Sequence, residues 1–160
     1  MPKKLLVEKT EKKPSRSSLF SAKTEYACVA LLELALHHND PTPLRLKAIS
    51  EKHDISHRFL VQILLQLKSA GFVASIRGAT GGYRLAKEPD EITLHEVMSV
   101  VDSQSAGTIK SSADRNTTSV RVLLNAWRAV AAKEREMLAD ITFADLVRQL
   151  QGRGDPMYHI

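Results

Sequence analysis

Two residues in the middle of the chain have side chains that can pair with the edges of bases. Arg58 and Gln62 are four residues apart, which places them on one face if this segment is a helix. A guanidinium group matches the O6 and N7 acceptors of guanine, and a carboxamide pairs with adenine through two hydrogen bonds. We therefore interpret both as candidate base contacts. The alternatives are a phosphate contact for Arg58 and a solvated surface amide for Gln62.

A glycine-rich stretch follows over residues 77–84, Arg-Gly-Ala-Thr-Gly-Gly-Tyr-Arg. Gly78, Gly81 and Gly82 permit a tight turn and a close approach of the backbone to another molecule. We expect Arg77, at the base of this turn, to enter a minor groove, where narrow A·T-rich DNA strengthens the negative potential. An ordinary surface arginine at the end of a strand is the alternative.

Further polar residues lie near the expected helix starts and strand ends. Hydroxyl, imidazole and cationic side chains in such places contact phosphate, which positions a protein on DNA without reading its sequence. The additional candidates for the DNA-binding surface are Ser56, His57, Lys23, Thr24, Tyr26 and Arg84.

Apolar periodicity and helix-capping residues predict the elements that carry these groups. The expected elements are helices over 22–38, 46–52 and 57–70, strands over 72–76 and 83–86, and a short helix capped by Thr93. In the second helix, we expect Leu46, Ala48 and Ile49 to face inward. A helix–turn–helix followed by a two-stranded wing is a mainly α fold with a small β wing. This winged helix-turn-helix DNA-binding domain is predicted over residues 19–100.

The C-terminal part carries a different pattern. A polar loop is expected over 101–118, and a long helix over 120–138 has apolar residues at spacings of four and three, typical of a helix that packs against a partner. With a last helix capped by Thr142, residues 119–151 are predicted to form a dimerisation unit. The candidate dimerisation residues are Val120, Leu123, Leu124, Trp127, Ala131 and Leu138.

Charge and composition narrow the class of protein. Of the net charge of +5, residues 1–20 carry +4, residues 21–86 carry +3, and residues 87–160 carry −2. The half predicted to face DNA is therefore basic. Residues 1–18 and 152–160 are predicted to be tails, and the first of them is expected to be basic and disordered. No stretch is apolar enough for a membrane span or a secretory signal, and a single cysteine favours the reducing cytoplasm.

These segments together resemble the Rrf2 family of bacterial winged-helix regulators. The resemblance covers about residues 19–150, and its most specific part is the wing, residues 75–86. The other matching segments are residues 21–27, 46–51, 55–64, 67–73, 91–93, Trp127 and 141–146. This chain has Ala79-Thr80 where proline-glycine is usual, which stiffens the turn and leaves its depth of insertion open.

The resemblance implies a homodimer that reads a pseudo-palindromic operator, with Gln62 on bases and Arg77 in the minor groove. Relatives that carry an iron–sulfur cluster place three cysteines in and just after the loop that is 102–118 here, and this loop has none. Leu124 stands where some relatives keep a histidine ligand. Because a cluster needs about four thiolate or imidazole donors, no cofactor and no metal site are expected. Cys28 is interpreted as a buried structural cysteine, with a thiol switch as the alternative.

The leading hypothesis is therefore a cluster-free, dimeric, sequence-specific transcriptional regulator, most simply a repressor, whose partners are double-stranded DNA and a second copy of itself. The alternative is a regulatory module that acts through a partner protein, which like any effector is unidentified. An enzyme is not expected, because no nucleophile–base arrangement, phosphate-binding loop or metal motif is present.

Overall fold

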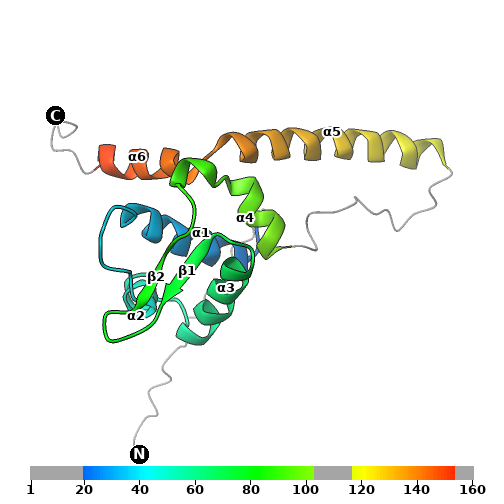
Figure 1. The fold of residues 1–160 in the computed structure, drawn as a ribbon. Coiled ribbons are helices and arrows are strands. Elements are labelled where there is room, and N and C mark those ends of the chain that lie inside the picture. The colour runs from blue at the N-terminus through cyan, green and yellow to red at the C-terminus, as the bar shows by residue number, and fades with distance from the viewer. Residues whose placement is uncertain (1–19, 103–116, 154–160) are drawn as a thin grey trace, which may run out of the picture.

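The computed structural model describes residues 20–102 and 117–153. Three helices and an antiparallel hairpin come first, and three further helices follow (Figure 1). The elements are α1 (Ala22–Leu36), α2 (Leu46–His53), α3 (His57–Ser69), β1 (Val73–Ile76), β2 (Gly82–Leu85), the 3₁₀ turn η1 (Pro89–Glu91), α4 (Leu94–Val101), α5 (Thr118–Asp140) and α6 (Phe143–Arg153). The predicted class, mainly α with a small β wing, is confirmed.

Hydroxyl side chains cap the helices where the sequence predicts. The hydroxyls of Ser21, Ser56 and Thr93 each accept a hydrogen bond from an amide in the first turn of their helices. Thr142 does the same for Asp145 at 3.1 Å. Each bond satisfies an amide that has no partner inside the helix. These side chains therefore explain why the helices begin where they do.

The boundaries differ from the predictions by one or two residues. Helix α1 ends at Leu36, α4 reaches Val101, and α5 begins at Thr118, so the connection between α4 and α5 is shorter than expected. Helix α6 runs to Arg153, so two residues of the expected C-terminal tail are helical. The N-terminal tail, most of the loop and the rest of the C-terminal tail lie outside the described residues.

The turn between α2 and α3 depends on the left-handed backbone of Asp54, whose φ is +52°. Ile55 is buried directly after it, and the Ser50 hydroxyl donates to its carbonyl at 2.6 Å. Ile49 is the buried residue of α2, whereas Ala48 is exposed, so its predicted inward position is wrong. Successive residues of a helix point about 100° apart, and this short helix buries only one narrow stripe.

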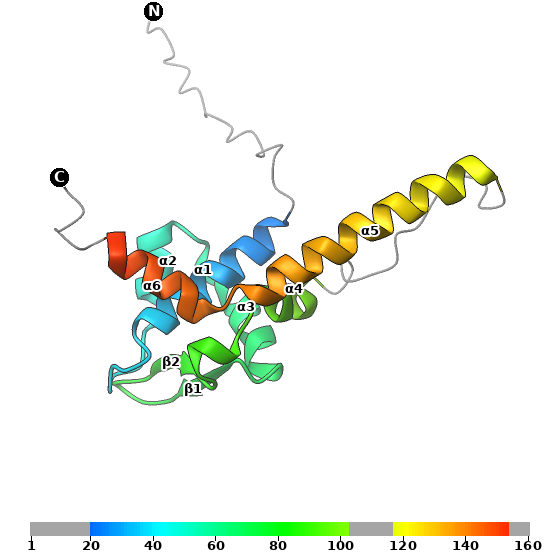
Figure 2. The same cartoon turned by 90° about the horizontal axis from the view of Figure 1, so that it is seen from above.

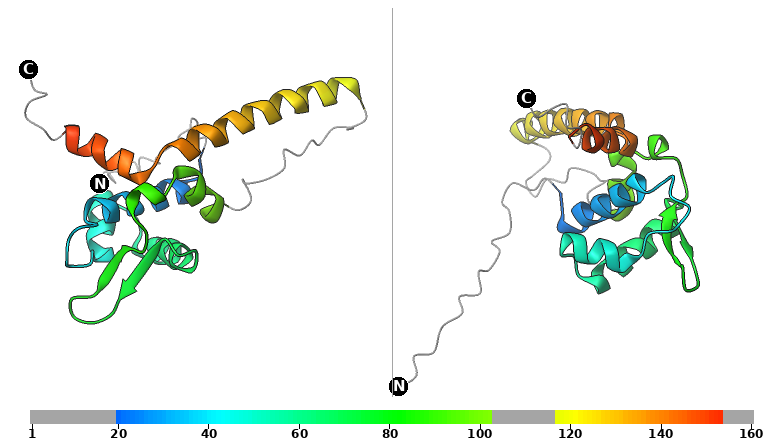
Figure 3. Two further views of the ribbon diagram at one scale, coloured as in Figure 1. Left: turned by 45° about the horizontal axis from the view of Figure 1, so that its top comes forward. Right: turned by 90° about the vertical axis from the view of Figure 1, so that its left-hand side faces the viewer.

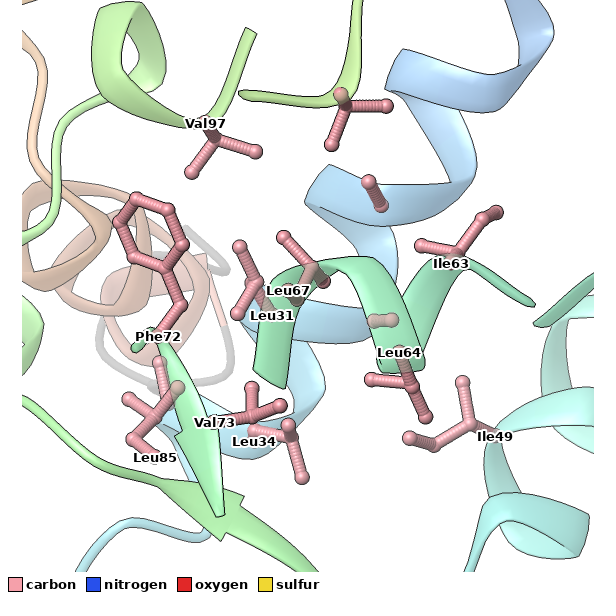
Figure 4. Close-up of a cluster of buried hydrophobic side chains, with 14 of the residues drawn as sticks. Leu31, Leu34, Ile49, Ile63, Leu64, Leu67, Phe72, Val73, Leu85 and Val97 are labelled. Carbon is pink, nitrogen blue, oxygen red and sulfur yellow. The ribbon is translucent and has the colours of Figure 1, made fainter. Parts of the chain in front are cut away.

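One apolar core joins the early helices to the hairpin and to α4 (Figure 4). Its side chains come from α1, α2, α3, both strands and α4, and those labelled in the figure are Leu31, Leu34, Ile49, Ile63, Leu64, Leu67, Phe72, Val73, Leu85 and Val97. Phe143, from the start of α6, is fully buried in the same core. The helix–turn–helix, the wing and the start of α6 therefore share one hydrophobic interior.

The chain returns to this core after α5. The Leu94 amide donates to the Ile141 carbonyl at 3.0 Å, and the Phe143 amide donates to the Ile92 carbonyl at 2.9 Å. Beyond this anchor, the N-terminal half of α5 projects past the rest of the molecule (Figure 2). Within residues 20–102 and 117–153, no helix has the length and apolarity to cross a membrane.

Candidate nucleic-acid interface

Helix α3 has one face in the core and one face in solvent. Leu60, Ile63, Leu64 and Leu67 are fully buried. Arg58 and Gln62 are exposed one turn apart, as a helix that reads a groove requires. Leu65 continues this face toward the C-terminus and is 52% exposed. Leu65 was not among the residues predicted from the sequence for this surface.

The start of α3 is open to solvent and is supported from behind by α1. Ser56 and His57 are exposed, and the Ser56 hydroxyl accepts the Phe59 amide at 3.5 Å. The Tyr26 ring meets the Phe59 ring edge to face, with centroids 5.7 Å apart. Tyr26 therefore packs against the first turn of α3, which places that turn relative to α1.

The first turn of α1 presents fewer groups to DNA than expected. Lys23 is half-buried, and Thr24 is only 3% exposed. The Thr24 hydroxyl accepts a hydrogen bond from the Ser21 hydroxyl at 3.1 Å. A phosphate contact by Thr24 does not fit this burial. The threonine instead belongs to the cap of α1.

The turn between the two strands, residues 77–81, is called the wing turn below. Gly78 has a φ of +112°, a conformation that other residues rarely adopt, and its carbonyl accepts the Gly81 amide at 3.0 Å. Arg77 is exposed at the start of this turn, directly after β1. The backbone therefore displays Arg77 on a tight, solvent-facing loop.

The glycines that end the turn approach other parts of the same chain. A Cβ on Gly81 would lie 2.3 Å from the Ile76 carbonyl oxygen, and one on Gly82 would lie 2.5 Å from the Leu44 carbonyl oxygen. Leu44 and Tyr83 form an isolated antiparallel bridge at this point. The backbone at Gly82 therefore does make a close approach, but its neighbour is Leu44, in the connection between α1 and α2 of the same chain.

Two arginines bind this hairpin to the segment before α2. Arg84 donates to the Pro41 carbonyl at 2.9 Å. The sequence predicted a phosphate contact for Arg84, and its guanidinium also has this partner in its own chain. Arg45 donates to the Ala79 carbonyl in the wing turn at 2.6 Å. Sequence reasoning missed Arg45. The one sequence feature that could have drawn attention to Arg45 is its place at a helix start, where a residue with a capping oxygen is usual.

Helix α3 and the wing turn lie on the same side of the molecule (Figures 1 and 3). Helices α2 and α3 and the wing turn occupy one side, and α5 and α6 run along the opposite side (Figures 1 and 3). Lys68 of α3 donates to Ser75 of β1 at 2.7 Å. These elements therefore form a single surface that can meet one duplex.

A buried carboxylate joins the helix–turn–helix to α1. Oε1 of Glu33 lies 2.8 Å from Lys52 Nζ and 2.8 Å from His53 Nε2, both at the end of α2. Burial alone would raise the pKa of Glu33, but the hydrogen bonds and charges of Lys52 and His53 outweigh it and hold the pKa below its ordinary value. The contacts of Glu33 with Lys52 and His53 therefore hold α2 against α1 as long as Glu33 is ionised.

Helix α5 divides the expected dimerisation residues between two faces. Leu124 is buried, and Val120, Ala131 and Leu138 are half-buried within the single chain. Four of the exposed apolar residues of α5 form a stripe at spacings of four, three and seven, called the α5 stripe below, and Val122, which is 64% exposed, lies outside it. Its members are Leu123, Trp127, Val130 and Met137. Of the expected dimerisation residues, only Leu123 and Trp127 belong to this stripe, and the others are buried or half-buried within the single chain.

The donors in this chain do not fit an iron–sulfur cluster. Cys28, the single cysteine, packs against the core, and burial raises its pKa to about 11, which disfavours the thiolate that iron requires. Among the residues that the structure describes, no three histidine, cysteine or acidic side chains form a group able to hold a metal. Residues 103–116 contain neither cysteine nor histidine.

Comparison with known proteins agrees with this geometry. The sequence profile of the Rrf2 family, described as an iron-dependent transcriptional regulator, matches residues 20–149. The HTH-type transcriptional regulator IscR of Vibrio atlanticus is 36% identical over 129 residues, which cover 80% of this chain and 74% of that protein.

Two solved structures share the fold. The IscR structure from T. potens has a TM-score of 0.69 and 31% identity, covering 84% of this chain and 89% of that one. CymR, the global cysteine regulator of B. subtilis, has a TM-score of 0.71 and 31% identity, covering 81% of this chain and 96% of that one. These relatives are regulators rather than enzymes, and the chain described here belongs to the Rrf2 family of DNA-binding transcriptional regulators.

Proposed function

We propose that the protein is a homodimeric repressor that binds a pseudo-palindromic operator without an iron–sulfur cluster. The observation that carries the proposal is the shared surface of α3 and the wing turn. Arg58, Gln62 and Arg77 are exposed on these elements, which supports a mode of binding in which Arg58 and Gln62 contact bases in the major groove and Arg77 enters the adjacent minor groove. Repression is the simplest outcome, because a protein that covers its operator excludes other proteins from that DNA.

The α5 stripe supports a homodimer. Trp127 is 48% exposed and Met137 is 68% exposed on a helix that projects from the domain. Apolar side chains at these spacings favour helix-to-helix packing between two copies. Two-fold pairing would present two recognition helices to half-sites about one helical turn, roughly 34 Å, apart.

The cluster-free part of the proposal rests on the donor set. One half-buried cysteine cannot supply the four donors that a cluster needs. Any signal must therefore reach this protein by another route, such as an effector or a partner protein. A single cysteine also fits a reducing cytoplasm, where a bacterial regulator meets its operator.

The deciding experiment has two parts. Genomic footprinting identifies the bound sites, and fluorescence anisotropy then measures affinity for one such site between 50 and 300 mM salt. We expect an inverted-repeat site and a steep linear fall of log affinity with log salt, because each neutralised phosphate releases counterions. A flat salt dependence with no enriched sites would favour the module that acts through a partner protein.

A further inference from the structure

We propose that Arg45 is a positioning residue for DNA reading, because its guanidinium ties the wing turn to the start of α2. The bond from Arg45 Nη2 to the Ala79 carbonyl oxygen joins residues 34 positions apart in the chain. In this arrangement the distance between helix and wing is set before DNA arrives. The inference rests on the proposed function, since it assumes that the wing turn contacts DNA.

The position of Arg45 is unusual for a helix start. Arg45 is the N-cap of α2, with extended backbone angles, and its side chain makes no capping hydrogen bond. N-cap positions favour serine, threonine, aspartate and asparagine, whose oxygens accept a first-turn amide. Ser21, Ser56, Thr93 and Thr117 cap other helices of this chain in that way. An arginine forgoes this stabilisation, and its contact with Ala79 gives the side chain a different role.

The tip of the wing turn has few other attachments. Residues 76–80 are all exposed. Within the described ranges, no other side-chain hydrogen bond reaches residues 78–80. The base of the hairpin is held separately, by the Leu44–Tyr83 bridge and by the bond from Arg84 to Pro41. Arg45 is therefore the residue whose loss would free the tip while the base stays in place.

A fixed tip improves binding because a loop that is already ordered loses less entropy when it meets DNA. Arg77 is two residues from Ala79 on the same turn, so its placement depends on the same contact. Arg45 acts through the backbone of the turn and through Arg77. Its effect on affinity should therefore be coupled to that of Arg77 rather than added to it.

The test combines Arg45→Ala, Arg77→Ala and the double variant in the full-length protein. Hydrogen exchange of the Gly81 amide, which donates to Gly78 at 3.0 Å, reports on the wing turn without DNA. We expect Arg45→Ala to speed this exchange at least about tenfold and to weaken operator binding about fivefold to tenfold. In the Arg77→Ala background, the same substitution should weaken binding less than about twofold. Arg45→Gln, which keeps a donor without the charge, should restore part of the exchange protection.

Lys47→Ala is the matched control for exchange, because Lys47 is an exposed cation on the same helix whose ion-pair partner is Glu51. It should leave Gly81 exchange unchanged. Unaltered Gly81 exchange in Arg45→Ala would overturn the inference, and so would independent, additive losses of affinity, which indicate a direct phosphate contact by Arg45. A third outcome is faster Gly81 exchange in Arg45→Ala with unchanged DNA affinity in both Arg45→Ala and Arg77→Ala. It would overturn the DNA role of the wing but leave the contact between Arg45 and Ala79 in place.

Discussion

Leu44 and Tyr83 exchange two backbone hydrogen bonds, at 2.9 Å from the Leu44 amide and 2.8 Å from the Tyr83 amide. The connection between α1 and α2 thus pairs with β2 through one isolated antiparallel bridge. A hairpin of two strands is only marginally stable by itself. The added bridge and the shared core explain how so small a wing holds a defined orientation.

Gly82→Ala should disturb this contact. Its Cβ would lie 2.5 Å from the Leu44 carbonyl oxygen and 2.8 Å from the carbonyl carbon, so β2 or the connection must move. We expect a loss of about 1–3 kcal/mol in the free energy of unfolding, typical of overpacking. Operator affinity should fall as well, because the wing is displaced. Urea denaturation and anisotropy measure the two effects.

Gly152→Ala is the control for Gly82→Ala. Gly152 lies in α6 with no atom within 4 Å of an added Cβ. Alanine there should raise stability by about 0.5–1 kcal/mol or leave it unchanged. Equal stability of Gly82→Ala and the unsubstituted protein would mean that Leu44 gives way freely and that the bridge does not hold the wing.

The order and type of the elements could be predicted from the sequence because local signals agree. Ser21, Ser56 and Thr93 mark helix starts, and Gly71, with a φ of +84°, follows the end of α3 as a terminating residue should. The placement of Ala48 and the end of α1 at Leu36 were not predictable in this way. Both depend on which side of a short segment meets the core, which no local pattern specifies.

The candidate site was only partly predictable for a related reason. Arg58, Gln62 and Arg77 are exposed as expected, because helical spacing and glycine content report on exposure. The roles of Gly82 and Arg45 depend on contacts with segments more than 30 residues away. Likewise, a heptad pattern shows that α5 has an apolar stripe, but it does not tell whether Leu124 packs within its own chain.

Arg77→Ala should weaken operator binding and reduce the preference for A·T-rich sequence beside the half-sites. An arginine in a narrow minor groove senses the stronger negative potential there, whereas alanine does not. We expect the largest losses on A·T-flanked sites and smaller losses on G·C-flanked ones. Gel shifts on paired operators measure the difference. Equal losses on both would identify Arg77 as a phosphate contact.

If the α5 stripe forms the proposed dimer interface, Leu123→Asp combined with Val130→Asp should leave the protein monomeric. Both residues are exposed, at 46% and 66%, so the changes spare the core of the protomer. Leu124→Ala should behave differently: Leu124 is 5% exposed, and its truncation should cost about 2–5 kcal/mol of stability. Light scattering and thermal unfolding separate the two outcomes. A dimeric mass in the double aspartate variant would exclude the α5 stripe as the interface.

Cys28 should react slowly with iodoacetamide in the folded protein. Burial raises its pKa to about 11, whereas an unperturbed cysteine has a pKa of about 8.5. At pH 8 the folded thiol is therefore roughly a thousandth ionised, and labelling should be on the order of a hundredfold slower than in urea. The rate should rise about tenfold per pH unit between pH 7 and 9.5. Labelling as fast in the folded state as in urea would revive the thiol-switch alternative.

Glu33→Gln should make the protein less stable at neutral pH and remove part of its acid sensitivity. The pKa of Glu33 is lowered in the folded state, so its stabilising contribution is fully present above the unfolded pKa of about 4.3. It is lost as pH falls through the lowered folded pKa. We therefore expect a deficit of about 1–2 kcal/mol at pH 7, from the loss of charged hydrogen bonds with Lys52 and His53, which shrinks as pH falls through the lowered folded pKa of Glu33. Urea midpoints across this range measure it.

The control for Glu33→Gln is Glu136→Gln, which removes an exposed carboxylate paired with Lys133 at 3.1 Å on α5. Exposed pairs contribute about 0–1 kcal/mol, so its urea midpoints should follow the unsubstituted protein at every pH. The difference between the two variants isolates the buried position of Glu33 from the general effect of one lost charge. A Glu33→Gln deficit that persists unchanged at pH 3 would show that packing rather than ionisation holds α2 against α1.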